Sequence, residues 1–202
     1  MKQLDIPIPS EKEVDYWLAY WDSLPNYVEQ EKALDKLFIE TFKNNEDLSE
    51  ILIKCSTLND FYSTNIFRIY DVAKHIELLH IDEMLRKGDE SLVGKIANID
   101  LKNDADETKH YCFYSFASKY CSHHKPLDYP IYDSYVEKIL KYFRKINKKF
   151  VFSNEDLKDY AKFKNILLNF QRLYGIEKYN LKDLDRYLWQ LGKKYFPNNY
   201  GK

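Results

Sequence analysis

The chain has 202 residues, 45% of them hydrophobic, so it is long enough for a substantial core and too apolar for a disordered chain. No apolar run is long enough to span a bilayer, and the first residues lack the pattern of a secretory signal peptide. Because the chain has an odd number of cysteines, three, we expect free thiols and a cytoplasmic protein. Neither GxGxxG nor GxxxxGK[ST] occurs among its five glycines, which argues against Rossmann and P-loop proteins.

The net charge of -1 conceals an asymmetry along the chain. Residues 1–101 carry 11 Lys and Arg against 20 Asp and Glu, whereas residues 102–202 carry 20 against 12. A basic half can attract an anionic partner, but two halves of opposite charge can equally pack together and neutralise each other. We expect the halves to pack together.

Helix signals begin at Ser10, which forms a capping box with Glu13. Apolar residues at helical spacing predict further helices around residues 34–42, 48–52, 63–80 and 90–98, with Gly88 ending a short segment between the last two. Residues 99–107, IDLKNDADE, are expected to form an acidic loop.

Four more helices are expected in the second half of the chain. The first runs from about Thr108 to Cys121, and Pro126 and Pro130 then bracket a turn. The next runs from about Asp133 to Lys148. Ser153 is expected to cap a helix that ends before Gly175, and Asn180 one that ends at Gly192. No strand with a period of two and no repeat is evident. The fold class is therefore all-α, a compact multi-helix single domain spanning residues 1–202.

Residues 111–140, YCFYSFASKYCSHHKPLDYPIYDSYVEKIL, form the most distinctive stretch. The piece YPIYDSYVEKIL resembles the catalytic-aspartate segment of the helix-hairpin-helix DNA glycosylases, the HhH-GPD superfamily, in which a proline, an apolar residue and an aspartate introduce a helix. SFASKY resembles the helix that leads into it. LDRYLWQLGK, residues 184–193, is similar to the C-terminal end of some relatives.

The resemblance implies a catalytic role for Asp133. Cleavage of an N-glycosidic bond builds positive charge on the sugar, and an ionised carboxylate next to the sugar stabilises that charge. A helix N-terminus keeps such a carboxylate ionised. The alternative is that Asp133 is only an N-cap, where an aspartate typically stabilises the helix by about 1 kcal/mol relative to alanine.

The sequence departs from the superfamily in its hairpin. The superfamily has a glycine-rich hairpin before the aspartate helix, but no glycine lies between Gly94 and Gly175 here, so a different turn replaces it near residues 99–108 or it is absent. The four-cysteine iron–sulfur loop of some members is excluded by the cysteine count. Lys109 and Lys119 are the candidates for the lysine nucleophile of lyase members, although neither has the expected spacing from Asp133, and solvated flank lysines are the alternative.

Nucleic-acid contacts are predicted around the same helix. Lys138, Lys141 and Lys145 lie at helical spacing and could contact phosphates. The alternative is that they are ordinary solvated lysines, part of whose positive charge is neutralised by Glu137. Tyr129 and Tyr132 flank the aspartate and could line a base pocket, with core packing as the alternative. Cys121 and His124 lack a second pair of metal ligands, so neither a metal nor another cofactor is expected.

These observations predict a DNA-binding protein related to base-excision DNA glycosylases, with double-stranded DNA as its partner and no membrane association. The alternative is a non-catalytic helical module that binds nucleic acid or a protein partner. A pocket that holds Asp133 would favour the enzyme, and a solvent-facing Asp133 would favour the module.

Overall fold

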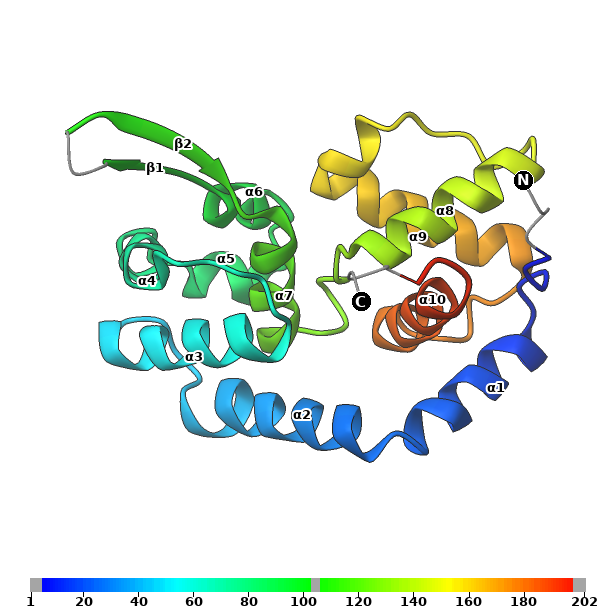
Figure 1. Ribbon diagram of the computed structural model, residues 1–202, viewed down its shortest axis with the longest axis horizontal. Helices are drawn as coiled ribbons and strands as arrows, with labels where there is room; N and C mark the ends of the chain where they lie inside the picture. Colours follow the sequence, from blue (N-terminus) through cyan, green and yellow to red (C-terminus); the bar gives the residue numbers. More distant parts are fainter. Residues whose placement is uncertain (1–4, 103–105, 198–202) are drawn as a thin grey trace. The chain divides into compact units, whose positions relative to one another are not determined.

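The computed structural model describes residues 5–102 and 106–197 and divides the chain into two compact units. Unit 1 combines Met1–Val28 with Tyr132–Lys202, and unit 2 is the continuous segment Glu29–Ile131. Helices dominate both units, which confirms the all-α prediction (Figure 1). The packing of an acidic half against a basic half in a single domain stays a prediction.

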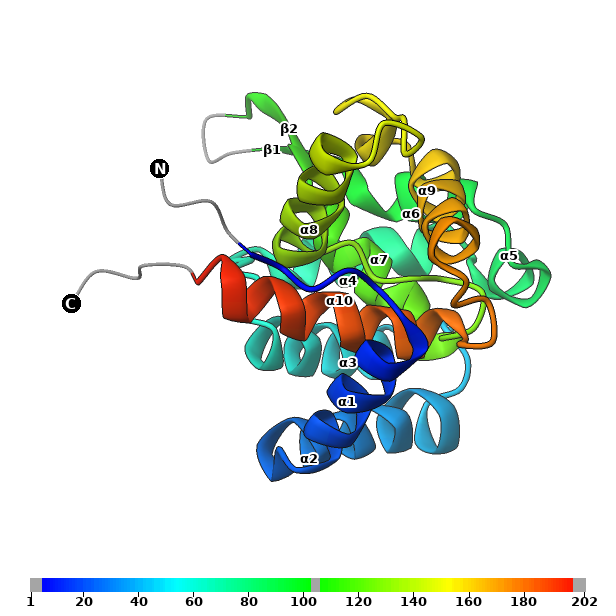
Figure 2. The ribbon, with the colours of Figure 1, turned by 90° about the vertical axis from the view of Figure 1, so that its right-hand side faces the viewer.

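Unit 1 is built on α10 (Leu181–Tyr195), which packs against α8 (Ser134–Ile146) and α1 (Glu11–Asp22). Figure 2 shows α1 alongside α10. A 3-10 turn, η2 (Asp156–Lys158), leads into α9 (Tyr160–Tyr174). Apolar residues at helical spacing along these helices, such as Val136, Ile139 and Phe143 of α8, are buried and form the core of the unit.

Side-chain caps fix where most of these helices begin. Ser10 accepts a hydrogen bond from the backbone of Glu13, which confirms it as the N-cap and gives one of the two bonds of the predicted capping box. Asn180 caps α10 as predicted and forms a complete capping box with Asp183. Ser153 does not cap α9. It exchanges hydrogen bonds with Asp156 at the start of η2, and Asp159 caps α9 instead.

Two predicted helix ends have different outcomes. Gly175 ends α9 with a backbone φ of 65°, as expected for a C-terminal glycine. α10 does not end at Gly192 but continues to Tyr195. Gly192 is needed for close packing instead, since a Cβ placed there would lie 2.6 Å from the Cβ of Tyr135 and 2.7 Å from its carbonyl oxygen.

Unit 2 contains α3 (Leu48–Phe61), α4 (Ile69–Leu78), α5 (Asp82–Lys87), α6 (Ser91–Ala97) and α7 (Tyr114–His124). The boundary between the units falls inside α2 (Pro25–Asp35). A π-helical turn, η1 (Lys36–Thr41), follows α2. α3 packs against α4 and α7, and α7 against α6. The core residues of this unit include Phe38, Ile51, Val72, Ile96 and Phe116.

The structure corrects two predicted boundaries in unit 2. α4 begins at Ile69 rather than near residue 63, because Ser63 and Asn65 have positive φ angles that a helix cannot contain. Residues 98–112, expected as an acidic loop and a helix start, contain the antiparallel strands β1 (Asn98–Lys102) and β2 (Thr108–Cys112). Residues 103–105 of that loop lie outside the described residues.

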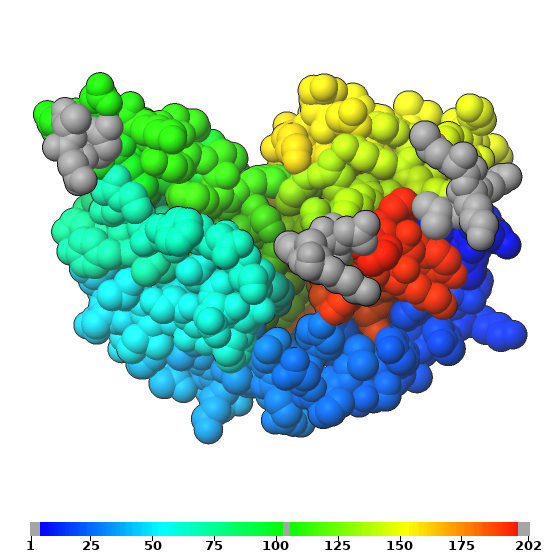
Figure 3. Space-filling view, in the orientation of Figure 1, coloured from blue at the N-terminus to red at the C-terminus, as the bar shows by residue number. Residues whose placement is uncertain are grey.

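The hairpin pairs Asn98 with Cys112 and Lys102 with Thr108, and Ile99 and Leu101 of β1 turn inward. β1 contacts α4 and α6, and the space-filling view shows the green hairpin beside the cyan helices on the surface of unit 2 (Figure 3). In the part of the chain that the structure describes, no helix combines the length and the apolarity needed to cross a bilayer.

Candidate functional site

Asp133 is the N-cap of α8 in unit 1. Its backbone is extended, with a φ of -137° and a ψ of 151°, and its carboxylate accepts a hydrogen bond of 2.8 Å from the backbone N–H of Tyr135. The residue is half-buried. A carboxylate at this position could stabilise a cation.

A polar cluster follows Asp133 on the same helix. Tyr132 donates its hydroxyl hydrogen to Glu137, and Lys141 and Lys158 both bind this glutamate. Burial alone would raise the pKa of Glu137, but the two ammonium groups outweigh it and hold that pKa below its ordinary value. Glu137 therefore remains a carboxylate that neutralises part of the positive charge of α8.

The three lysines predicted to bind phosphates differ in their surroundings. Lys141 is committed to Glu137, and the ammonium group of Lys138 lies 5.3 Å from the ring centroid of Tyr135. Lys145 is exposed, as are Lys148 and Lys149 just after the end of the helix. The basic surface of α8 is therefore most open towards its C-terminus.

The remaining predicted site residues belong to unit 2. Lys109 lies on β2 rather than at a helix start, and its exposed ammonium group is 5.2 Å from the ring centroid of Tyr111. Lys119 is buried in α7 and donates a 2.6 Å hydrogen bond to the hydroxyl of Ser115. The predicted catalytic set of Asp133, Lys109 and Lys119 is thus divided between the two units.

Both predicted base-pocket tyrosines are buried, and each hydroxyl is engaged inside its own unit. Tyr129 donates to the carbonyl oxygens of Met84 and Asp89 in unit 2. Tyr132 binds Glu137 in unit 1, and its ring meets that of Phe163 at an angle of 77°. These contacts are those of core tyrosines, and the base-pocket role stays a prediction.

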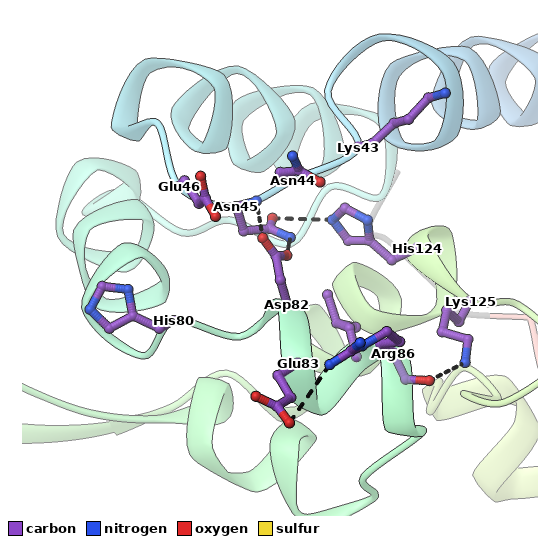
Figure 4. A pocket seen from close by; sticks show the side chains of 11 residues that line it. Lys43, Asn44, Asn45, Glu46, His80, Asp82, Glu83, Arg86, His124 and Lys125 are labelled. Carbon is purple, nitrogen blue, oxygen red and sulfur yellow. Dashed lines mark hydrogen bonds and ion pairs between the residues drawn. The ribbon is translucent and has the colours of Figure 1, made fainter.

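Unit 2 contains a cavity of about 550 Å³ that the sequence did not predict. Its wall is formed by the loop between η1 and α3, by α5 with the turn before it, and by the C-terminus of α7 (Figure 4). All but one of the lining residues are polar or charged: Lys43, Asn44, Asn45, Glu46, His80, Asp82, Glu83, Leu85, Arg86, His124 and Lys125.

Asn45 is the centre of the hydrogen-bond network behind this cavity. Its backbone N–H and its side-chain amide nitrogen donate to the two carboxylate oxygens of Asp82, at 2.9 and 2.6 Å. Its side-chain oxygen accepts 2.6 Å hydrogen bonds from Lys54 and from the hydroxyl of Tyr120, and the His124 ring lies 3.2 Å away. Asn45 therefore links a buried cation to a carboxylate at the cavity wall.

Lys54 is completely buried in this network. Its ammonium group also donates to the carbonyl oxygens of Phe42 and Asn44, at 3.1 and 2.8 Å, so all three of its hydrogens are used. Burial lowers the pKa of Lys54 to about 8, against the opposing field of Asp82. The lysine thus holds the polar end of η1 together instead of facing solvent.

Burial, together with the nearby Lys54, lowers the pKa of His124 well below its ordinary value, so this histidine is neutral. Burial also raises the pKa of the Cys121 thiol, which disfavours the thiolate that binds metals. Among the described residues, no three or more His, Cys, Asp and Glu side chains are arranged to hold a metal ion.

One signal in the sequence could have revealed the network. Lys54 lies three residues after Ile51 and four before Leu58, inside the apolar stripe of α3. A lysine in such a stripe needs buried acceptors. The acceptors lie in the segment just before α3, from Phe42 to Asn45, and carry no recognisable motif.

Comparisons with known proteins place the chain among its relatives. The family model HI_0787_N, described as an N-terminal domain, matches residues 13–128. A Haemophilus influenzae protein named only as uncharacterized is 45% identical over 177 residues, which cover 87% of this chain and 78% of that protein. No solved structure matches the chain. Both the family model and the Haemophilus influenzae relative show that the chain belongs to the HI_0787_N family.

Proposed function

We propose that the chain is a cytoplasmic protein that binds double-stranded DNA through α8 and is related to the base-excision DNA glycosylases. The supporting observation is that one helix carries both Asp133 at its N-terminus and the basic residues that follow. Unit 1, to which α8 belongs, has 18 Lys and Arg against 13 Asp and Glu, a net charge of +5. An excess of positive charge attracts the phosphates of DNA.

In this proposal Asp133 is the carboxylate that stabilises a sugar cation as the N-glycosidic bond breaks. Lys138, Lys141 and Lys145 bind phosphates, Lys119 or Lys109 is an electrostatic or nucleophilic helper, and Tyr129 and Tyr132 line the base pocket.

Two observations favour the alternative, a non-catalytic helical module that binds nucleic acid or a protein. The carboxylate of Asp133 is already used as a helix cap. Residues 98–112 form a β-hairpin where a glycosylase has its glycine-rich pair of helices. In the module Asp133 stabilises α8 and has no other role.

The two functions are separated by binding to a duplex with an abasic-site analogue and to the same intact duplex, over a series of salt concentrations. We expect tighter binding to the abasic duplex and a strong loss of affinity with salt. Replacing Lys138 and Lys145 with alanine should weaken binding to both duplexes and reduce the salt slope by about one for each lost phosphate contact.

Asp133→Asn tests the catalytic residue, because asparagine is also a good N-cap and should preserve the fold. We expect this variant to lose its preference for the abasic duplex while its circular dichroism stays unchanged. For the lysine replacements, Lys12→Ala is the matched control, since Lys12 is an exposed lysine on α1 of the same unit. Equal, salt-sensitive binding to both duplexes would favour the module, and no binding at low salt would contradict both DNA-directed functions.

A further inference from the structure

The cavity of unit 2 is large enough for a small metabolite. Its volume of about 550 Å³ falls within the range of small-molecule pockets, and Leu85 is its one apolar lining residue in the described part of the chain. The charged and polar side chains offer partners to a ligand that itself carries charges or hydrogen-bonding groups, while their hydrocarbon stems form much of the remaining wall.

One side of the cavity presents carboxylates. Both oxygens of Asp82 are fixed by donors of Asn45, and each retains a lone pair for a further donor. Asn45 is in turn held by Lys54 and Tyr120, so the carboxylate is preorganised by a buried second layer. Figure 4 shows Glu46 beside this pair. This side of the cavity suits an ammonium group.

The other side presents cations, together with the carboxylate of Glu83 next to Arg86. In the view of Figure 4, Lys43, Arg86 and Lys125 lie on the opposite side of Asp82 from Glu46. Lys125 is committed to the Asp128 carboxylate and to the carbonyl oxygen of Arg86, at 2.5 and 3.0 Å. Arg86 has only a 3.7 Å contact with Glu83 and is therefore available to an anionic group.

The formal charges of the lining balance, with three carboxylates against three cationic side chains. Charges of both signs around a cavity whose formal charges balance match a molecule that carries both signs.

We propose that this cavity binds a small zwitterion with an ammonium and a carboxylate group, that is, a free amino acid or a dipeptide. The ammonium group binds the Asp82 carboxylate, and the carboxylate group binds Arg86 at the rim. The site lies wholly within unit 2 and does not depend on DNA binding by α8.

The test is a titration of the full chain with each of the common free L-amino acids, and with dipeptides, followed by the backbone amide resonances in NMR spectra. We expect saturable shifts centred on Asn45 and Asp82 for at least one of these compounds. Its N-acetyl derivative lacks the ammonium group and its amide lacks the carboxylate, so each should bind at least about tenfold more weakly. Saturation by a dipeptide but by no single amino acid would identify the longer ligand.

Two variants locate the site. Asp82→Asn should weaken binding about 10- to 100-fold, because it removes the charge that faces the ammonium group. Arg86→Gln, at the exposed rim, gives a second test if Asp82→Asn fails to fold. Lys87→Gln is its matched control, since Lys87 also contacts Glu83 but does not line the cavity. Shifts with none of the compounds, or equal effects of Arg86→Gln and Lys87→Gln, would overturn the proposal.

Discussion

Lys54 shows how a buried charge can hold a polypeptide turn together. Its ammonium group replaces the water that would otherwise satisfy the carbonyl oxygens at the end of η1, and it polarises the amide that binds Asp82. Removal of the Lys54 ammonium group would leave the carbonyl oxygens of Phe42 and Asn44 without this donor, which typically costs about 1–3 kcal/mol for each group left unsatisfied. The network is therefore a condition for the shape of the cavity.

His124 makes the stability of the network depend on pH. Because its pKa lies well below 6.5 in the folded protein, the unfolded chain takes up a proton below pH 6.5 that the folded protein does not. Acid therefore stabilises the unfolded state. We expect the free energy of unfolding to fall by about 2 kcal/mol more between pH 7 and pH 5 in the wild type than in His124→Phe.

Urea unfolding of both proteins at the two pH values measures this difference. Phenylalanine preserves the aromatic contacts that His124 makes with Phe38 and Tyr120, so the variant should fold. It loses the contact with Asn45 at both pH values, and only the pH-dependent part of the difference reports the titration. An equal fall in both proteins would show that His124 does not contribute to it.

Residues of the network were hidden from the sequence for a physical reason. Asn45, Asp82 and the α7 pair of Tyr120 and His124 belong to three segments that only the tertiary fold brings together. None of these residues has a local pattern that requires a polar partner. By contrast, the cap at Asp133 is local, so the sequence predicted its position correctly. Its catalytic role depends on the resemblance and stays a prediction.

At the scale of elements, the sequence predicted helices well where a cap or a glycine marks their ends. It missed the strands because β1 offers only Ile99 and Leu101 as an alternating pair, too few for a clear period of two. It also misplaced the start of α9, since the reciprocal bonds between Ser153 and Asp156 mimic a capping box in a single 3-10 turn.

Gly192 was interpreted as a helix end, but it lies at the contact between α10 and α8, and this gives an element-scale prediction. An alanine there would place its Cβ against the backbone of Tyr135, which cannot move without shifting α8. We expect Gly192→Ala to lower the free energy of unfolding by about 1–3 kcal/mol, despite the better helix propensity of alanine.

Gly94→Ala is the matched control within α6. No atom lies within 4 Å of a Cβ placed there, so alanine should add about 0.5–1 kcal/mol of stability by restricting the unfolded chain. Urea unfolding measures both variants. If Gly192→Ala were as stable as Gly94→Ala, the close packing of α8 on α10 would be contradicted.

At the scale of the whole molecule, the boundaries of the two units could not be predicted from the sequence. One boundary falls inside α2, and the other follows the turn between Pro126 and Pro130, so neither is marked by a flexible linker. The family model also crosses the first boundary, because residues 13–128 combine most of α1 with nearly all of unit 2.

The two units also differ in charge, although their boundaries differ from those of the two halves of the sequence. Unit 2 has 13 Lys and Arg against 19 Asp and Glu, a net charge of -6, whereas unit 1 has a net charge of +5. The excess of positive charge thus lies in the unit that contains Asp133 and α8. DNA binding and the proposed zwitterion site are therefore expected in different units.

This division predicts the behaviour of residues 29–131 expressed alone. The segment is continuous and has a core of its own, in which α3 packs against α4 and α7, so we expect a helical protein with a cooperative unfolding transition. It should bind the same zwitterion as the full chain but no DNA at low salt, because it lacks α8 and is acidic. Circular dichroism, urea unfolding and duplex binding measure these properties. DNA binding by this segment would show that the DNA-binding surface does not require α8. Absence of a cooperative unfolding transition would show that unit 2 needs unit 1 to fold.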